Sequence, residues 1–176
     1  MKRFLKTLRR FTRNDRGTAT VEFVFVFPVM LAFIFVMFDL GLIMVKYVVL
    51  ENSLDIVVRE VRLHGIQGGQ SGSDYFKQKV CARSPLLADC ANNLFIEMTP
   101  IDIGTTFVSS APTCVDRTVN DPPAVEFVPG VENGIVYIRA CVIVDRYLPT
   151  TLLNAFALDA SGGIRLIADS AYVVEP

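Results

Sequence analysis

Apolar residues dominate the chain from Phe23 to Val45, a run of 23 residues in which Asp39 carries the only charge. An α-helix rises about 1.5 Å per residue, and roughly 20 residues suffice to cross the hydrocarbon core of a bilayer. We therefore predict a transmembrane helix over residues 18–49. Asp39 lies 17 residues after Glu22, about 25 Å along such a helix, so we expect Asp39 at the outer surface of the bilayer.

The helical pattern continues beyond the predicted membrane segment. Apolar residues recur there at three- and four-residue spacing, with charged residues on the other faces; the apolar positions are Leu50, Leu54, Val57, Val58 and Val61. We predict one continuous helix from about Thr20 to His64, ended by Gly65. Its last part, residues 50–64, would extend the membrane helix outside the bilayer.

Three later segments have the composition of β-strands, rich in β-branched and aromatic residues or alternating between apolar and polar positions; they are residues 93–103, 135–148 and 164–174. Pro100 favours an edge position for the first of them, because proline cannot donate a ladder hydrogen bond. Asn133-Gly134 is a strong turn signal before the second. We expect residues 124–128 to pair with that second strand as a hairpin.

Helices and loops complete the predicted outer part of the chain. We expect short helices over residues 74–83 and 150–158, a Gly/Ser-rich linker over residues 66–73, and a long loop over residues 104–123. The predicted fold class is α+β, with a long N-terminal transmembrane and stalk helix packed against a small antiparallel sheet of three or four strands. Residues 65–176 would form this single head domain.

Charge is divided unevenly along the chain. Residues 1–16 contain seven Lys and Arg against one acid, Asp15, whereas the remaining residues carry ten Lys and Arg against seventeen Asp and Glu. Basic residues beside a membrane helix stay on the cytoplasmic side, so we predict a cytoplasmic N-terminus, a single crossing of the bilayer and an outer C-terminal domain. The basic segment adjoins the apolar run and no nucleic-acid recognition motif follows it, so no nucleic-acid partner is expected.

All four cysteines lie in the predicted outer domain, where oxidising conditions favour disulfides. Of the three possible pairings we prefer Cys81 with Cys90, which closes a short local loop, and Cys114 with Cys141, which tethers a loop to a strand. Free thiols are the alternative. Zinc binding is less favoured, because the chain has no C-x-x-C pair and a single histidine, His64.

No pattern in the chain indicates catalysis. His64, at a predicted helix end, is better explained by its interaction with the helix dipole than as a general base. Neither a G-x-S-x-G nor an H-E-x-x-H motif is present. We therefore predict a protein that is not an enzyme and that has no catalytic residues, no metal site and no cofactor.

The junction between the basic segment and the apolar run resembles the processing signal of type IV pilins and pseudopilins. In those families a prepilin peptidase cuts after a glycine at the cytoplasmic face, and the fifth residue of the mature chain is a glutamate. Gly17, Thr18 and Glu22 stand at these positions. An ordinary secretory signal, by contrast, has a shorter apolar core and an A-x-A-like exit, which this chain lacks.

The match is closer to TadE-like minor pseudopilins of Tad/Flp pilus systems. These proteins share a short motif at the start of the membrane helix, a proline six residues after the glutamate and an acidic residue near the far end; the corresponding residues here are Val21, Glu22, Phe23, Pro28, Asp39 and Gly41. The C-terminal segment from Tyr147 to Pro176 is also similar, although its spacing is shorter. The middle of the chain matches nothing specific, so the choice between TadE-like and TadF-like remains open, whereas TadG-like chains are much larger.

This resemblance implies a pilin-like fold, a basic leader peptide over residues 1–17 and cleavage between Gly17 and Thr18. Glu22 would pair with the new α-amine of a neighbouring subunit during assembly, and Pro28 would distort the helix locally. The implied partners are a prepilin peptidase, other pilins and pseudopilins, the inner-membrane assembly platform and the lipid bilayer. The implied location is the bacterial inner membrane, with a periplasmic head.

Two alternatives follow from the same residues. The first is an uncleaved single-pass anchor for a periplasmic binding domain, in which the basic segment serves only as a topology signal. The second is a membrane-tethered enzyme, which would require a pocket with convergent polar groups in the outer domain.

Overall fold

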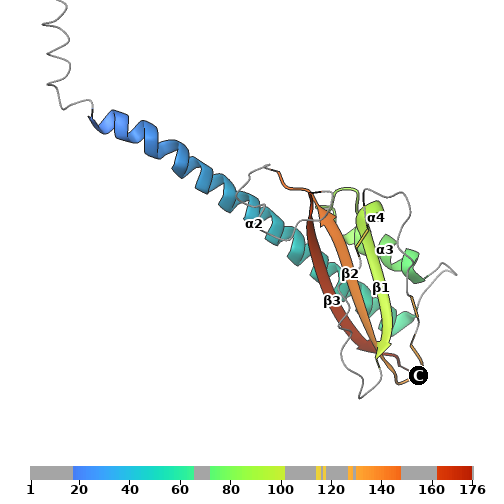
Figure 1. Ribbon diagram of the computed structural model, residues 1–176. Helices are drawn as coiled ribbons and strands as arrows, with labels where there is room; N and C mark the ends of the chain where they lie inside the picture. The colour runs from blue at the N-terminus through green and yellow to red at the C-terminus, as the bar shows by residue number, and fades with distance from the viewer. Residues whose placement is uncertain are drawn as a thin grey trace, which may run out of the picture. The chain divides into compact units, whose positions relative to one another are not determined.

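The computed structural model describes residues 18–65, 72–101, 114–115, 117, 127–128, 130–147 and 162–175 (Figure 1). The leader peptide predicted over residues 1–17, the helix predicted over residues 150–158 and most of the loop predicted over residues 104–123 lie outside these ranges. Two compact units make up the chain, residues 1–38 and residues 39–176. The second unit thus begins well before residue 50, where the extension of the membrane helix was predicted to start.

One long helix, α2 (Thr18–His64), confirms the predicted continuous helix. Pro28 lies inside it. The helix ends where predicted, because Gly65 adopts a φ of 66°, a conformation that only glycine reaches without steric cost. Gly65 N–H also donates to the carbonyl of Val61 at 2.8 Å, which satisfies one of the last helical acceptors.

The sheet is antiparallel and has three strands, β1 (Leu94–Ile101), β2 (Ile135–Val144) and β3 (Ile164–Val173), in the order β1-β2-β3. In the register, Ile138 of the central strand lies opposite Met98 on one side and Ser170 on the other. Figure 1 shows the three strands side by side. The predicted α+β class is therefore confirmed, as is the edge position of the strand that contains Pro100.

The hairpin predicted between residues 124–128 and β2 is wrong for the part of that segment that the structure describes. Phe127 instead forms an isolated parallel bridge with Met98 of β1, and Val128 N–H donates to the Met98 carbonyl at 3.1 Å. The reason is that β1 and β3 occupy both edges of β2, so the central strand has no ladder positions left.

Within the second unit, α2 and one face of the sheet bury a common core. All five apolar positions predicted on the helix are buried in it, together with alternate residues of the strands. The strand residues in this core are Leu94, Ile96, Met98, Val136, Ile138, Ala140, Val142, Val144, Leu166 and Ala168. The apolar residues of the helix, spaced three or four apart, and those of the strands, spaced two apart, therefore pack into one apolar layer.

Two short helices accompany the sheet. Helix α3 (Gly72–Arg83) contains the predicted 74–83 helix and starts inside the segment predicted as linker; it contacts β1 and contributes the fully buried Phe76. Helix α4 (Cys90–Asn93) was not predicted. Its four residues are too few to show a helical period. Asp89, which precedes it, has a φ of 51°, and no pattern in the sequence predicts this left-handed conformation.

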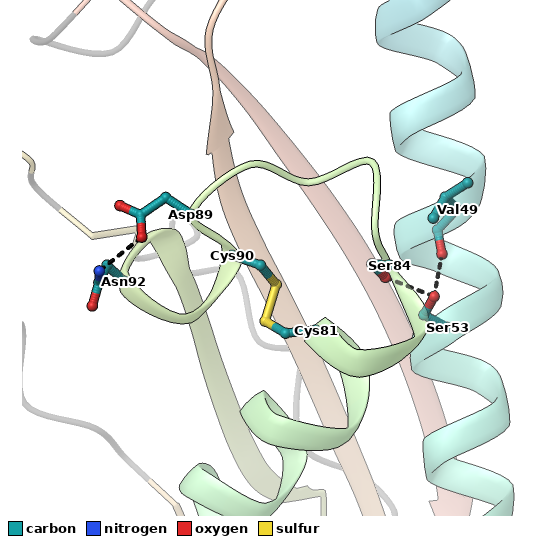
Figure 2. Close-up of a disulfide and its surroundings, with 7 residues drawn as sticks. All are labelled: Val49, Ser53, Cys81, Ser84, Asp89, Cys90 and Asn92. Carbon is teal, nitrogen blue, oxygen red and sulfur yellow. Dashed lines mark hydrogen bonds between the residues drawn. A yellow bond between two sulfur atoms is a disulfide. The ribbon is translucent and has the colours of Figure 1, made fainter.

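A buried pair of serines joins α2 to the end of α3. Ser84 Oγ donates to Ser53 Oγ at 2.7 Å, and Ser53 Oγ donates to the Val49 carbonyl at 2.6 Å (Figure 2). Ser53 and Ser84 are both almost fully excluded from solvent. Because buried hydroxyls are costly when unpaired, this contact fixes where α3 ends against α2.

Replacing Ser53 by alanine should destabilise the head. Ser53→Ala leaves the buried Ser84 hydroxyl without its acceptor, and we expect a loss of about 1–3 kcal/mol in the free energy of unfolding. Chemical denaturation in detergent micelles, followed by circular dichroism, measures it. In the Ser53→Ala background, Ser84→Ala should cost little more, because both partners are then gone. Ser170→Ala, which removes an exposed bond to Asp55, is the matched control; an equal loss there would contradict the role of burial.

Candidate functional site

The first unit offers an almost entirely apolar helical surface. Its large side chains from Val21 to Phe38 are mostly exposed, and the ring centroids of Phe23 and Phe27 stack at 4.9 Å. The helix over residues 20–64 contains an 18-residue window with a mean hydropathy of 2.6, none of which is buried inside the protein. In length and composition this helix is able to cross a membrane. An unburied apolar surface of this size requires a bilayer or other helices to cover it.

The residues predicted to act in processing and assembly lie at the start of this helix. Thr18 is the first residue of α2, and Glu22 lies four residues later with an exposed side chain. A spacing of four residues places the two on one face, about 6 Å apart along the axis. Gly17 lies outside the described residues. Pro28 sits further along, and the helix continues through it without interruption.

Asp39, the first residue of the second unit, contacts the segment that follows β2. Its side chain is 1% exposed, and its Oδ1 accepts a hydrogen bond from Tyr147 N–H at 3.2 Å. Its Oδ2 is buried without a hydrogen-bond partner. The expected position of Asp39 at the bilayer surface stays a prediction; its enclosure by the head was not predicted.

Lys46 reinforces the same attachment two helical turns later. Its ammonium lies 3.5 Å from the Asp145 carbonyl and 4.5 Å from the centroid of the Tyr147 ring. A cation over an aromatic face gains about 0.5–2 kcal/mol, more when it is shielded from water, and Lys46 is buried. Asp39 and Lys46 thus both bind the segment that follows β2. Sequence analysis did not predict this contact, because nothing local links the helix to residue 147.

Two disulfides staple the head. Cys81 near the end of α3 is bonded to Cys90 at the start of α4 (Figure 2), and Cys114 is bonded to Cys141 of β2. Cys141 faces away from the core shared with α2, so the second bond holds Cys114 against the opposite face of the sheet. Arg117 supports this placement by donating to the Ile143 carbonyl and to Asp145 Oδ1. Among the described residues no group of three His, Cys, Asp or Glu side chains is arranged to hold a metal.

A groove between α2 and α3 contains the densest ionic cluster among the described residues. Glu60 on α2 accepts hydrogen bonds from Lys79 at 2.7 Å and from Arg83 at 3.1 Å, and the Tyr75 hydroxyl approaches it at 3.5 Å. The bond from Lys79 lowers the pKa of the Glu60 carboxyl, and the Glu60 carboxylate in turn raises the pKa of the Lys79 ammonium. Glu60 lies beyond residues 18–49, the predicted membrane segment. The spacing of Lys79 and Arg83, four residues apart on a predicted helix, was the available signal for this cluster.

Comparison with known proteins identifies the helical part of the chain. Residues 17–59 match the family model described as TadE-like protein. Over these residues the chain is similar to TadE-like proteins. The matched range begins at Gly17 and includes Glu22, Pro28 and Asp39, so the resemblance drawn from those residues is confirmed. No curated protein and no solved structure matches the chain.

The match over residues 17–59 supports an association of this protein with a Tad pilus. TadE-like pilus proteins are structural, and a pilus component interacts with other pilins and with the membrane. The matched range ends at Arg59 inside α2. The sheet, both short helices and both disulfides therefore lie outside the matched range.

Proposed function

We propose that this protein is a minor pseudopilin that takes part in assembly of a Tad/Flp pilus. A prepilin peptidase would cut between Gly17 and Thr18, removing the basic leader over residues 1–17. The mature protein would then act by packing its membrane helix among those of other pilins, pseudopilins and the inner-membrane assembly platform. The observation that carries this proposal is the match to the TadE-like family model, which begins at Gly17 and includes a glutamate five positions later.

Charge and hydropathy support the proposed location. The basic residues before Gly17 favour a cytoplasmic N-terminus, and the apolar helix is long enough to cross the inner membrane once. In this arrangement the transmembrane part would cover residues 18–49, with residues 50–64 as its extension and residues 65–176 as a periplasmic head. Disulfides Cys81–Cys90 and Cys114–Cys141 suit that compartment, where oxidising conditions preserve them.

Glu22 has a physical role in this proposal. A carboxylate at the edge of a hydrocarbon core is costly unless it is paired, and ionisable groups at such positions are usually functional. Cleavage after Gly17 creates a cationic α-amine on Thr18. Pairing between Glu22 of one subunit and the Thr18 amine of its neighbour would neutralise both groups and set the register of the two helices. Pro28 would adjust the helix between the two ends of the membrane segment.

The mass of the protein from pilus-producing cells tests the proposal directly. We expect intact-mass measurement of the membrane-extracted protein to show loss of residues 1–17 and an N-terminus at Thr18. In cells lacking the prepilin peptidase the full chain beginning at Met1 should accumulate. An uncleaved anchor for a binding domain predicts the Met1 chain in both strains, and that result would overturn the pseudopilin proposal.

A further inference from the structure

The exposed face of α2 changes from apolar to polar within the second unit. Over residues 39–50 its exposed large side chains, between 49% and 60% exposed, are Met44, Val45 and Val48. The exposed positions that follow are mostly polar and begin with Glu51, Asn52 and Asp55. Such a change is typical of the place where a membrane helix leaves the lipid, because an exposed apolar face needs an apolar cover and a polar face needs water.

The charged residues of the same stretch avoid its exposed face. Asp39 and Lys46 are the only charged residues between positions 39 and 50, and their side chains are buried. A charged side chain that faces acyl chains is costly, so charges in a lipid-covered helix turn toward protein. Beyond Val48 the exposed face carries charge, starting with Glu51. The distribution of charge therefore agrees with a lipid cover that ends near Val48.

Part of the head lies beside this stretch of helix. Asp39 Oδ1 accepts a hydrogen bond from Tyr147 N–H at 3.2 Å, and the Lys46 ammonium lies 4.5 Å from the centroid of the Tyr147 ring. Asp39 and Lys46 are seven residues apart, about 10 Å along the helix axis, and both precede Val48. Tyr147 thus lies at a level of α2 where the opposite face of the helix is apolar.

The side chains at this level are of the kinds that favour a membrane surface. The Tyr147 side chain is 63% exposed, although Lys46 lies over its ring. Tyr47, next to Lys46 on α2, is half-buried. Tyrosine is enriched at membrane–water interfaces because its ring is apolar and its hydroxyl is polar, and lysine near the end of a membrane helix reaches the same layer.

We propose that residues 145–147 of the head lie in the phospholipid headgroup layer of the outer leaflet, with the Tyr147 ring at the boundary between headgroups and acyl chains. The occupant is lipid because the exposed ring and the apolar face of α2 lie at the same level of one membrane helix. The headgroup layer is polar enough for Asp145, whose carboxylate is paired with Arg117. This inference rests on the proposed crossing of the membrane by α2, but it does not depend on cleavage after Gly17.

Single tryptophans test this contact, because the chain contains no tryptophan of its own. Three full-length variants, Tyr147→Trp, Val45→Trp and Val131→Trp, are made in a bacterium without Tad genes, so processing and pilus assembly do not enter. Each is reconstituted into vesicles of phosphatidylethanolamine and phosphatidylglycerol, with or without phospholipids brominated near the headgroup end of their acyl chains. Bromine quenches tryptophan fluorescence only at short range.

Val45 and Val131 are the matched references for Tyr147. Val45 lies on the exposed apolar face of α2. Val131 is 76% exposed and precedes β2. The ten residues of β2 span about 30 Å and separate Val131 from residues 145–147. We expect brominated lipid to reduce the emission of Tyr147→Trp and of Val45→Trp at least about twofold, since both positions lie in layers occupied by lipid. Val131→Trp should respond only to iodide in the water.

The pattern of quenching separates this inference from the membrane placement of α2. If Val45→Trp is quenched by brominated lipid while Tyr147→Trp behaves like Val131→Trp, the head does not reach the lipid and the inference fails alone. If neither Val45→Trp nor Tyr147→Trp is quenched, the membrane placement of α2 fails as well. Equal quenching of all three variants would contradict a contact confined to residues 145–147. Circular dichroism, with thiol labelling to confirm both disulfides, verifies that each variant is folded.

The unmodified chain allows a second measurement that needs no substitution. It is reconstituted into the same vesicles with a phospholipid that carries a diazirine at the headgroup end of an acyl chain. After irradiation, mass spectrometry of the digested protein should find lipid on peptides that contain Tyr147 and on those that contain Met44 and Val45, but not on those that contain Val131. Label on the α2 peptides without label on residues 145–147 would overturn the inference.

Discussion

Gly17→Arg should abolish maturation of this protein and the formation of Tad pili. Peptidases that cut after a small residue bind the backbone closely there, and glycine allows that approach because it has no side chain. An arginine at the same position fills this space and adds a charge at the membrane surface. We expect the full chain from Met1 to accumulate in the inner membrane, no mature chain from Thr18 to form, and surface pili to be lost.

The measurement combines intact mass, membrane fractionation and electron microscopy of the cell surface. Membrane insertion should be preserved in Gly17→Arg, since the apolar run is unchanged and the added charge strengthens the cytoplasmic signal. Thr12→Arg adds the same charge to the leader without touching the cleavage position, so it should mature normally. Normal pili with an unprocessed Gly17→Arg chain would show that processing has no part in assembly.

Glu22→Ala should leave processing intact while preventing incorporation beside other pilins. Removing one partner of a poorly solvated ion pair costs about 3–5 kcal/mol, because the other charge is left without compensation. A loss of about 3 kcal/mol corresponds to more than a hundredfold in an association constant. We therefore expect the mature protein to be present at normal level, but its co-purification with the assembly platform and the number of surface pili to fall at least about tenfold.

Glu51→Ala provides the matched control for that experiment. Glu51 is an exposed glutamate on the same helix and makes no ion pair within the described residues. Its removal changes the net charge equally but should leave co-purification and pili unchanged. If Glu22→Ala behaves like Glu51→Ala in both readouts, Glu22 has no pairing role and the proposed mechanism of assembly fails.

Local features of the sequence account for the elements that were predicted correctly. The helix to His64 follows from an apolar run joined to a three- and four-residue period, and its end follows from Gly65. Strands β1, β2 and β3 coincide with β-branched segments whose alternation is visible without a structure. The family resemblance was available for the same reason, because Gly17, Glu22 and Pro28 lie close together in the sequence, within the range that matches the family model.

Features that depend on contacts between distant residues were missed or wrong. Residues 124–128 were paired with the nearest strand along the chain, yet Phe127 bridges Met98, because β2 already has two neighbours. The burial of Asp39 depends on Tyr147, 108 residues away. The groove depends on α3 lying beside α2 so that Lys79 and Arg83 reach Glu60.

The sequence by itself determined the long apolar helix, its length, its basic N-terminal flank and the positions of the strands, because each depends on neighbouring residues and on the fixed periods of helix and strand. The tertiary structure alone decided the order of the strands, the enclosure of Asp39 by the head and the grouping of Glu60 with Lys79 and Arg83 between α2 and α3. Those features arise when the chain buries one face of α2 against the sheet, since this packing brings together side chains that no local pattern connects.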